Sequence, residues 1–384
     1  MQNFTYENTT RIHFGEGQIA QIANEIPKDA KVLVTYGAGS IKKNGVYEQV
    51  KEALKNHDWA EFSGIEPNPQ YDTAMKAVNK IKEEGFNYLL AVGGGSVLDG
   101  TKFISAAVNY KGNDPWELLT TGDIAVTDAL PIGCILTLPA TGSETNCFAV
   151  VSKGNNKLSF KTPAPRPKFV VLDPKTTMSL SERQTANGVV DAFIHVMEQY
   201  LTYPQNAKVQ DRFAESLLKN LIEDGIAILA NPDDYNIRAN IMLSATMALN
   251  AFLMTGVISD WTSHRIGHEI TGLYGIDHAR TLSIVFPAVI KVCSNDKKEK
   301  ILQYGERVLN VTEGDTDQRI EETISKTTDF FKAMGMPVSL RDAELNEDSI
   351  DEIISQLKKH GQTNLGEHGK IGYEAVRTIL QTAL

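Results

Sequence analysis

The sequence has little cysteine, little basic charge and no long apolar run. It contains 3 cysteines, Cys134, Cys147 and Cys293, with no CxxC pair. So sparse and odd a set argues against a disulfide framework and favours a reducing compartment. Acidic residues outnumber basic ones by 48 to 38, which gives a net charge of -10, and the chain has no long basic tract. Nucleic acids and anionic membrane surfaces are therefore not expected partners.

Neither a membrane span nor a signal peptide is expected from the sequence. No uninterrupted apolar run approaches the roughly 20 residues that a membrane helix needs. Residues Met1–Glu7 lack the basic and apolar blocks of a signal peptide. Together with the scattered cysteines, these features predict a cytoplasmic protein.

What the chain does have is the composition of an ordinary globular enzyme. Of its 384 residues, 42% are hydrophobic, 22% are charged and 8% are aromatic. This composition excludes disordered and fibrous classes, and its apolar fraction can fill large cores. The length suggests two domains rather than one.

In the first half of the chain, short β-rich runs alternate with helix-like stretches. The predicted strands are residues 31–36, 88–92, 132–138 and 169–172. Helices are predicted up to about Asn56 and over Ala74–Glu84. Nearly continuous apolar strands between helices indicate an α/β domain, with a parallel sheet covered on both faces. Ligands of such sheets bind at the carboxyl ends of the strands.

Strand-like runs nearly vanish after Ser179. Ser181 and Gln184 could cap a helix, because a hydroxyl and an amide three residues apart can satisfy orphan backbone groups reciprocally. Periodicity predicts helices over residues 188–200, 207–228, 238–254, 260–273 and 316–334. We therefore expect a boundary near residue 180, between an α/β nucleotide-binding domain (1–180) and an all-helical domain (181–384).

Two glycine turns follow predicted strands. They are Gly37-Ala38-Gly39-Ser40 and Gly93-Gly94-Gly95-Ser96-Val97-Leu98-Asp99. Glycines between a strand and a helix let the backbone approach a pyrophosphate, and the helix N-terminus adds free amides and a positive dipole end. Ser96 could cap its helix and donate to a phosphate. Two such turns favour nucleotide binding over ligand-free tight turns, although neither is a GxGxxG.

A third segment, Thr137-Leu138-Pro139-Ala140-Thr141-Gly142-Ser143-Glu144, also follows a predicted strand. Thr141, Ser143 and the amides of the turn can donate to a ribose or a phosphate. A helix N-cap with Glu144 in the first turn is an equally good interpretation. Both interpretations can hold together.

Asp191 and His195 are four residues apart, so they share one face of a helix. The apolar residues around them predict that this helix is largely buried. A buried carboxylate needs a partner. That partner is either the histidine itself, inside a core, or a metal ion.

His264, His268 and His278 fall within fifteen residues of each other. His264 and His268 share a helix face, and Gly275 ends that helix, so His278 can fold back. Imidazoles with one carboxylate are a usual ligand set for zinc, iron or cobalt. The spacing leaves open which three histidines bind, and satisfied core or surface histidines are the alternative. Because Glu269 follows the second histidine, this is not the HExxH of a metalloprotease.

Together these residues resemble the iron-containing (group III) alcohol dehydrogenase family, in particular its NADPH-dependent butanol dehydrogenase and aldehyde reductase branch. The resemblance covers essentially the whole chain. Its carriers are GGGSVLDGTK from Gly93 to Lys102, PATGSE from Pro139 to Glu144, Asp191-x-x-x-His195, and His264-x-x-x-His268 followed by Asp277-His278-Ala279. The metal motif is highly specific, and the glycine turns are moderately so.

The resemblance implies a Rossmann-like N-terminal domain, a helical C-terminal domain (a dehydroquinate synthase-like fold) and an active site in the cleft between them. It implies one divalent ion, Fe²⁺ or Zn²⁺, held by Asp191, His195, His264 and His278. His268 would lie near the nicotinamide and the substrate as a polar or proton-relay group, and it and Asp99 are the candidate catalytic residues. Ala279 stands where many relatives carry glycine, which fits the butanol branch but weakens any inference about the substrate.

The implied cofactor is NADP(H). Family members that select NAD place an acidic residue in the turn after the first strand, where it binds the ribose 2′-hydroxyl and repels a 2′-phosphate. Here Gly39 leaves room for a phosphate, Ser40 can donate to it, and Lys42 and Lys43 add positive charge; a glycine turn with solvated lysines is the alternative. The residues expected to contact the cofactor are Gly37, Gly39, Ser40, Asn68, Gly94, Gly95, Ser96, Asp99, Thr137, Leu138, Thr141, Ser143, Asn146, Lys157 and His268.

We therefore expect a homo-oligomeric, NADP(H)-dependent enzyme that interconverts small aldehydes and primary alcohols, with the metal polarising the carbonyl or alkoxide oxygen. A glycerol dehydrogenase-like or dehydroquinate synthase-like relative is the competing enzyme. The latter needs a basic pocket, and no cluster of Lys and Arg surrounds the histidines. A non-catalytic metal- or nucleotide-binding protein is the remaining alternative, which loss of a motif residue would have favoured.

Overall fold

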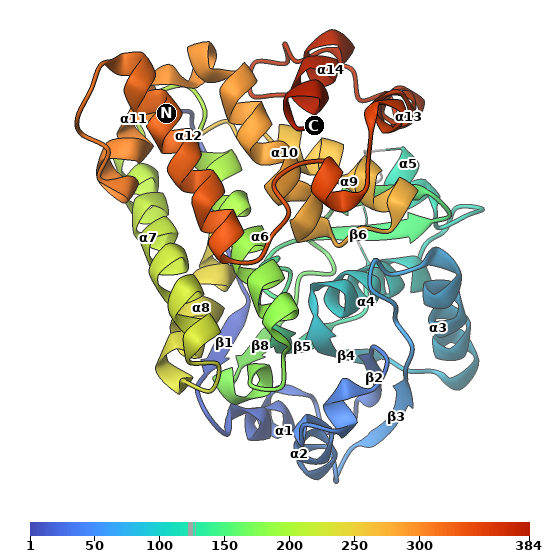
Figure 1. Ribbon diagram of the computed structural model, residues 1–384. Coiled ribbons are helices and arrows are strands. Elements are labelled where there is room, and N and C mark those ends of the chain that lie inside the picture. Colours follow the sequence, from blue (N-terminus) through green and yellow to red (C-terminus); the bar gives the residue numbers. More distant parts are fainter. Residues whose placement is uncertain (122–125, 127) are drawn as a thin grey trace. The chain divides into compact units, whose positions relative to one another are not determined.

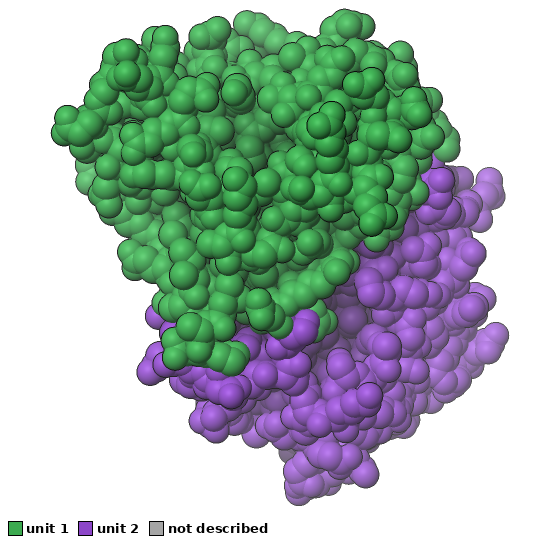
Figure 2. All heavy atoms as spheres, in the orientation of Figure 1, with its two compact units in different colours: residues 1–6, 182–232, 247–384 green, residues 7–181, 233–246 purple. Residues whose placement is uncertain are grey.

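The computed structural model describes residues 1–121, 126 and 128–384, and the chain divides into two compact units. Unit 1 comprises residues 1–6, 182–232 and 247–384, and unit 2 comprises residues 7–181 and 233–246 (Figure 2). The domain boundary predicted near residue 180 divides the sequence into two continuous segments, and it stays a prediction. In the compact units, residues 1–6 and 233–246 lie across that boundary.

Unit 2 is built on a parallel sheet with the strand order β1-β8-β5-β4-β2-β3 (Figure 1). Its strands are β1 (Arg11–Phe14), β2 (Lys31–Tyr36), β3 (Asp58–Phe62), β4 (Tyr88–Gly94), β5 (Ile132–Leu138) and β8 (Phe169–Leu172), and β6 (Phe148–Lys153) and β7 (Asn156–Lys161) form a separate antiparallel pair. Its helices include α1 (Ile22–Glu25), α2 (Val46–Ala53), α3 (Tyr71–Glu84), α4 (Gly95–Val108) and α5 (Glu117–Thr120). The parallel sheet predicted from the apolar runs is confirmed.

Helices cover both faces of this sheet. Successive strand residues point to opposite faces, so Leu33 and Leu89 pack with α3 and α4, whereas Val34 and Leu90 pack with α1 and α2. All four side chains are fully buried. Burial on both faces is the reason why β2 and β4 read as continuous apolar runs rather than as alternating ones.

Unit 1 is helical in its described residues. Its helices are α6 (Glu182–Tyr200), α7 (Lys208–Ala230), α9 (Thr262–Tyr274), α10 (His278–Val292), α11 (Ser294–Leu309), α12 (Thr316–Ala333), α13 (Glu347–Lys359) and α14 (Tyr373–Thr382). One of its cores joins α9, α10, α13 and α14. Most of α8 (Tyr235–Ala248), up to Thr246, belongs to unit 2, where Met242 lies in the core beneath the sheet. Among the described helices, none is long and apolar enough to span a bilayer.

The sequence predictions miss two exposed strands, a helix that contains a proline, and the helices α11, α13 and α14. β1 and β3 are the two edges of the sheet, and their residues are mostly exposed or half-buried, so they lack a continuous apolar run. α10 runs through Pro287, a residue that usually ends a helix. The predicted helix over 238–254 is too long: α8 ends at Ala248, and Ala251 has a left-handed φ of 75°.

Gly133 on β5 offers a test of the packing between β5 and the neighbouring strand β8. A Cβ at this position would lie 2.2 Å from Cζ of Phe169, which is fully buried. We expect Gly133→Ala to lower the free energy of unfolding by about 1–3 kcal/mol, as overpacked core positions do. In a double-mutant cycle by chemical denaturation, Phe169→Leu should relieve part of this cost. Strictly additive losses would contradict the steric explanation.

Candidate functional site

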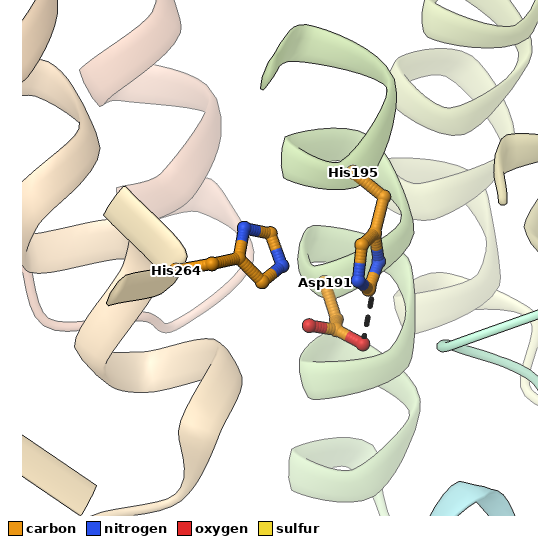
Figure 3. A group of neighbouring side chains, drawn as sticks. All are labelled: Asp191, His195 and His264. Atoms are coloured by element: carbon orange, nitrogen blue, oxygen red, sulfur yellow. Dashed lines mark ion pairs between the residues drawn. The ribbon is translucent and has the colours of Figure 1, made fainter. Parts of the chain in front are cut away.

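In unit 1, α6 carries the first two predicted metal ligands. Asp191 and His195 lie one turn apart on the same face and are 4% and 5% exposed. The Nδ1 atom of His195 is 3.7 Å from Oδ2 of Asp191 (Figure 3), which is too long for a hydrogen bond. The pair is therefore close without being satisfied by itself.

His264, the third predicted ligand, projects from α9 toward these two residues (Figure 3). One possible ligand atom from each of Asp191, His195 and His264 lies within 4.8 Å of the other two. All three side chains are buried. The fold thus brings together an oxygen donor and two nitrogen donors from two helices that are far apart in the sequence.

The buried ligand atoms of this group are better explained by binding to a divalent ion than by burial without partners. Among the described residues, neither Asp191 Oδ1 nor His195 Nδ1 has a hydrogen-bond partner, and leaving buried polar atoms in that state is costly. Burial lowers the pKa of His195 to about 4, although Asp191 opposes this shift. The ring is therefore neutral at physiological pH, which is the form that binds metal. Nitrogen and carboxylate donors of this kind suit zinc or ferrous iron.

The other two predicted site histidines lie beside this group. His268 follows His264 by one turn on α9, and its ring centroid is 6.4 Å from that of His264. His278 is the first residue of α10, and its ring centroid is 5.3 Å from that of His264 and 4.8 Å from that of His268. Gly275, in the left-handed conformation, ends α9 and lets the chain turn back as predicted. His278 lies just outside the group of three, and its role as a ligand stays a prediction.

Gly267 allows α10 to approach α9 at this point. A Cβ there would lie 2.8 Å from Oγ1 of Thr281 and 3.0 Å from a methyl carbon of Leu282. The Thr281 hydroxyl donates to the backbone oxygens of Gly267 and His278, at 3.2 and 2.7 Å. The absence of a side chain at Gly267 therefore sets how closely His278 approaches the other histidines.

Asp277 fastens the start of α10 to α6, a role that sequence reasoning did not assign. Its Oδ2 accepts hydrogen bonds from Nε of Arg183 and Nδ2 of Asn187, each at 2.9 Å. Both donors lie near the start of α6. The helix that carries Asp191 and His195 thus also holds the residue before His278.

In unit 2, many of the predicted cofactor residues lie at or after the carboxyl ends of three neighbouring strands. β2, β4 and β5 are neighbouring parallel strands that end at Tyr36, Gly94 and Leu138. A Cβ on Gly94 would meet the Leu138 side chain at 2.9 Å, and one on Gly95 would meet Oγ1 of Thr141 at 2.6 Å. The glycines therefore permit the close approach of the segment after β5, which is a physical reason for their presence here.

The segment after β5 is a turn and not the start of a helix. Backbone amides of Thr145 and Asn146 both donate to the carbonyl of Gly142, and β6 follows at Phe148. The helix N-cap interpretation is therefore wrong. A strand pairing with β7, which sequence reasoning missed, leads the chain away before a helix can form.

Asp99 and Lys102 tie this turn to α4. Asp99 accepts from the Ser143 hydroxyl (2.5 Å) and from the Val150 amide (3.0 Å). Lys102, only 1% exposed, donates to Ser143 Oγ (2.9 Å), Asn146 Oδ1 (3.0 Å) and the Phe148 carbonyl (2.8 Å). Burial lowers the pKa of Lys102, and Asp99 opposes this shift. The sequence pattern assigns no role to Lys102, because sequence alone does not show which lysines are buried.

A second set of contacts near the end of β4 joins Ser96, Asn68 and Lys157. The Ser96 hydroxyl accepts from the backbone amide of Asn68 at 3.3 Å, and Lys157 donates to Oδ1 of Asn68 at 2.8 Å. The predicted cap by Ser96 is wrong. α4 begins at Gly95 with Gly94 as its N-cap, so Ser96 already lies inside the first turn and reaches the neighbouring loop instead.

The turn after β2 holds the residues predicted to select the cofactor. Gly39 has a φ of 96°, and a Cβ there would meet nothing within 4 Å. Ser40 starts a short 3₁₀ turn that ends at Lys42. Lys42 is paired with Glu61 on β3 at 2.9 Å, and Glu61 also accepts from the hydroxyls of Tyr36 and Tyr47. Glu61 was missed because its strand was missed, and the charge of Lys42 is partly balanced by it.

The predicted residues thus fall into two groups, one in each unit. The group in unit 2 comprises Gly37, Gly39, Ser40, Asn68, Gly94, Gly95, Ser96, Asp99, Thr137, Leu138, Thr141, Ser143, Asn146 and Lys157, and the group in unit 1 comprises Asp191, His195, His264, His268 and His278. The histidines of the second group lie close together, and contacts join several members of the first group. The first suits phosphate and ribose groups, and the second suits a divalent ion.

Comparison with known families gives matches over both halves of the chain. Residues 9–174 match the family described as iron-containing alcohol dehydrogenase. Residues 185–384 match the C-terminal part of the Fe-containing alcohol dehydrogenase family. The two matches leave only short stretches of the chain outside them.

Relatives of known name and structure match along the full length. The chain is 51% identical over 386 residues to the NADPH-dependent aldehyde reductase YqhD of Escherichia coli K12, covering 100% of both chains. A crystal structure of E. coli K-12 YqhD superimposes with a TM-score of 0.99 at 50% identity, covering 100% of this chain and 99% of that one. The NADH-dependent butanol dehydrogenase A of Thermotoga maritima gives a TM-score of 0.94 at 36% identity, with 100% and 99% covered. These matches confirm the predicted fold.

Removal of a predicted ligand should remove metal and turnover together. We expect Asp191→Ala and His278→Ala to purify without a stoichiometric divalent ion and without activity, because each leaves an open, weaker site of three ligands. Elemental analysis of the folded variants is the measurement. His360→Ala, which removes another buried histidine that pairs with Glu269, should keep its metal. Full metal occupancy in both ligand variants would contradict the assignment.

Proposed function

Because this chain belongs to the iron-containing alcohol dehydrogenase family, we propose that it is an NADP(H)-dependent enzyme that interconverts small aldehydes and primary alcohols. The observation that carries the proposal is the buried group of Asp191, His195 and His264, in which one possible ligand atom from each residue lies within 4.8 Å of the other two. The full-length relationship to an NADPH-dependent aldehyde reductase supports the direction of aldehyde reduction.

The residues of this chain would divide the work between binding and proton handling. The proposed metal ligands are Asp191, His195, His264 and His278. A bound Fe²⁺ or Zn²⁺ would supply Lewis acidity at the carbonyl or alkoxide oxygen, and NADP(H) would supply the hydride. His268, beside the ligands but proposed not to be one, would hold or relay a proton. Asp99 and its partners would keep the turns that bind the cofactor in place.

Family membership does not decide which nicotinamide cofactor is used, since the relatives named above include an NADPH and an NADH enzyme. The preference for NADP(H) is supported by the turn after β2. It carries no carboxylate of its own, and Gly39 leaves open space where an acidic side chain would stand. The nearby Glu61 accepts from Tyr36, Tyr47 and Lys42, so its carboxylate is already engaged.

Two further expectations belong to this proposal. A cytoplasmic location is supported by the three free cysteines, Cys134, Cys147 and Cys293. A homodimer or larger homo-oligomer is expected from the family resemblance. Both stay predictions, to be tested by cell fractionation and by light scattering of the purified protein.

The cofactor preference can be tested with butyraldehyde as the substrate. The wild type should show a higher kcat/KM with NADPH than with NADH. Gly39→Asp should lose more of its NADPH activity than Gly39→Asn, because both side chains carry the same backbone strain at a φ of 96° but only aspartate repels a 2′-phosphate. Equal or better performance of the wild type with NADH would overturn the preference.

His268 can be separated from the ligands by its effect on turnover alone. His268→Ala should retain the divalent ion but lower kcat by about 10²–10⁴-fold, the usual range for general acid–base assistance, or shift the pH profile of kcat. Metal content and the pH profile are measured on the same preparation. Loss of metal in this variant together with retention in His264→Ala would mean that the two roles are exchanged.

A further inference from the structure

We propose that Glu198 is a positioning residue that orients His264 for metal binding and raises the affinity of the site for a divalent ion. The inference rests on the proposed function, since it presumes the ion. It means that Glu198, although it is outside the predicted ligand set, contributes measurably to the metal affinity of the site. The argument depends on what the Glu198 carboxylate contacts and on where α6 places it.

Glu198 continues the ligand face of α6. It follows Asp191 by seven residues and His195 by three, a spacing that keeps all three side chains on one side of the helix. Glu198 is 1% exposed. A carboxylate buried so completely must be compensated by donors, and its donors come from α9.

The carboxylate holds the first turn of α9. Its Oε1 accepts from the backbone amide of Ser263 at 2.6 Å, and its Oε2 accepts from the backbone amide of His264 at 3.3 Å. Free amides at a helix start need acceptors, and the two side-chain oxygens of Glu198 supply them here. Glu198 therefore fixes the backbone from which the His264 side chain projects.

The same carboxylate also holds the His264 ring. Oε2 forms a short contact with Nδ1 of His264. Nδ1 donates when it carries the proton of the neutral ring, and the lone pair is then on Nε2. The ring is thereby set in the tautomer and the orientation in which Nε2 can bind an ion. A carboxylate behind a ligating histidine also makes the ring a stronger donor.

The backbone before His264 is held by a second carboxylate. Asp260 accepts from the amide of Thr262 at 3.0 Å, and its own amide donates to the Glu198 carbonyl at 2.8 Å. Its other oxygen is paired at 2.9 Å with Lys297, which is 2% exposed. Trp261, between these contacts, has a left-handed φ of 68°. This conformation is costly for a large side chain and persists only where the surroundings impose it.

A buried pair of the same chemistry elsewhere in unit 1 serves as a matched control. Glu269, on α9, accepts from Nδ1 of His360 with distances of 2.8 and 3.0 Å. Its side chain is 5% exposed and that of His360 is 8% exposed, close to the 1% and 8% of Glu198 and His264. His360 is not among the proposed ligands. A variant at Glu269 therefore reports the cost of breaking a buried glutamate–histidine pair that orients no ligand.

The experiment compares Glu198→Gln, Glu198→Ala and Glu269→Gln as apoproteins. Affinity for Zn²⁺ is measured by competition with a chromophoric chelator, and the visible absorption of the Co²⁺-loaded proteins reports the ligand geometry. We expect both Glu198 variants to bind Zn²⁺ about 10–100-fold more weakly than the wild type, the usual loss for such partners. The Co²⁺ spectrum should change with them. Glu269→Gln should match the wild type in affinity and spectrum.

The outcomes separate this inference from the proposed function. A folded Glu198→Gln that binds Zn²⁺ as tightly as the wild type, with the same Co²⁺ spectrum, would overturn the positioning role and leave the proposed function intact. Equal losses in Glu269→Gln and Glu198→Gln would overturn it too, because the effect would then be general destabilisation. A wild type that holds no equivalent of metal would overturn the proposed metal site, and the positioning role with it. Glu198→Gln keeps the size and one acceptor oxygen, so the test survives if Glu198→Ala does not fold.

Discussion

Ionisable side chains are buried on one face of α6, and their need for partners constrains the residues that pack against this face. Asp191, His195 and Glu198 are all at most 5% exposed, so each must find its compensation inside the protein. Glu198 finds it in the first turn of α9, whose amides need acceptors. Asp191 and His195 find no comparable partner in the described residues. A divalent ion would satisfy both at once, which gives a physical reason for burying an aspartate beside histidines here.

Unit 2 meets a related constraint with different chemistry. Lys102, a buried lysine of this unit, donates to two side-chain oxygens and one backbone carbonyl of the segment after β5. That segment reaches α4 only because Gly94 and Gly95 have no side chains. These contacts hold the segment after β5 against α4 at the carboxyl ends of the strands. Preorganised backbone groups of this kind bind phosphates with little ordering cost.

How much of this was predictable depends on the range of the interaction. The buried strands β2, β4, β5 and β8 were predicted because each is a continuous apolar run, and Gly275 was recognised as the end of α9. The edge strands were missed because their residues are too exposed to form such a run. The β6–β7 hairpin was missed although β6 begins with the apolar run Phe148–Val151, because its partner β7 alternates with polar residues. Ser96 was assigned a cap that it does not make, because the start of α4 depends on how Gly94 packs against Leu138.

By itself, the sequence determined the features that arise within a few residues. The spacing of Asp191 and His195 on one helix face, the glycine turns at strand ends and the lack of a carboxylate beside Gly39 are all of this kind. Only the tertiary structure decided which distant groups meet. Glu198 and His264 are 66 residues apart, Lys102 and Asn146 are 44 apart, and Glu61 reaches Lys42 only because β3 pairs with β2. Local sequence pattern does not predict such contacts. The packing of distant segments, and not their spacing along the chain, makes one particular carboxylate the partner of one particular cation or ring.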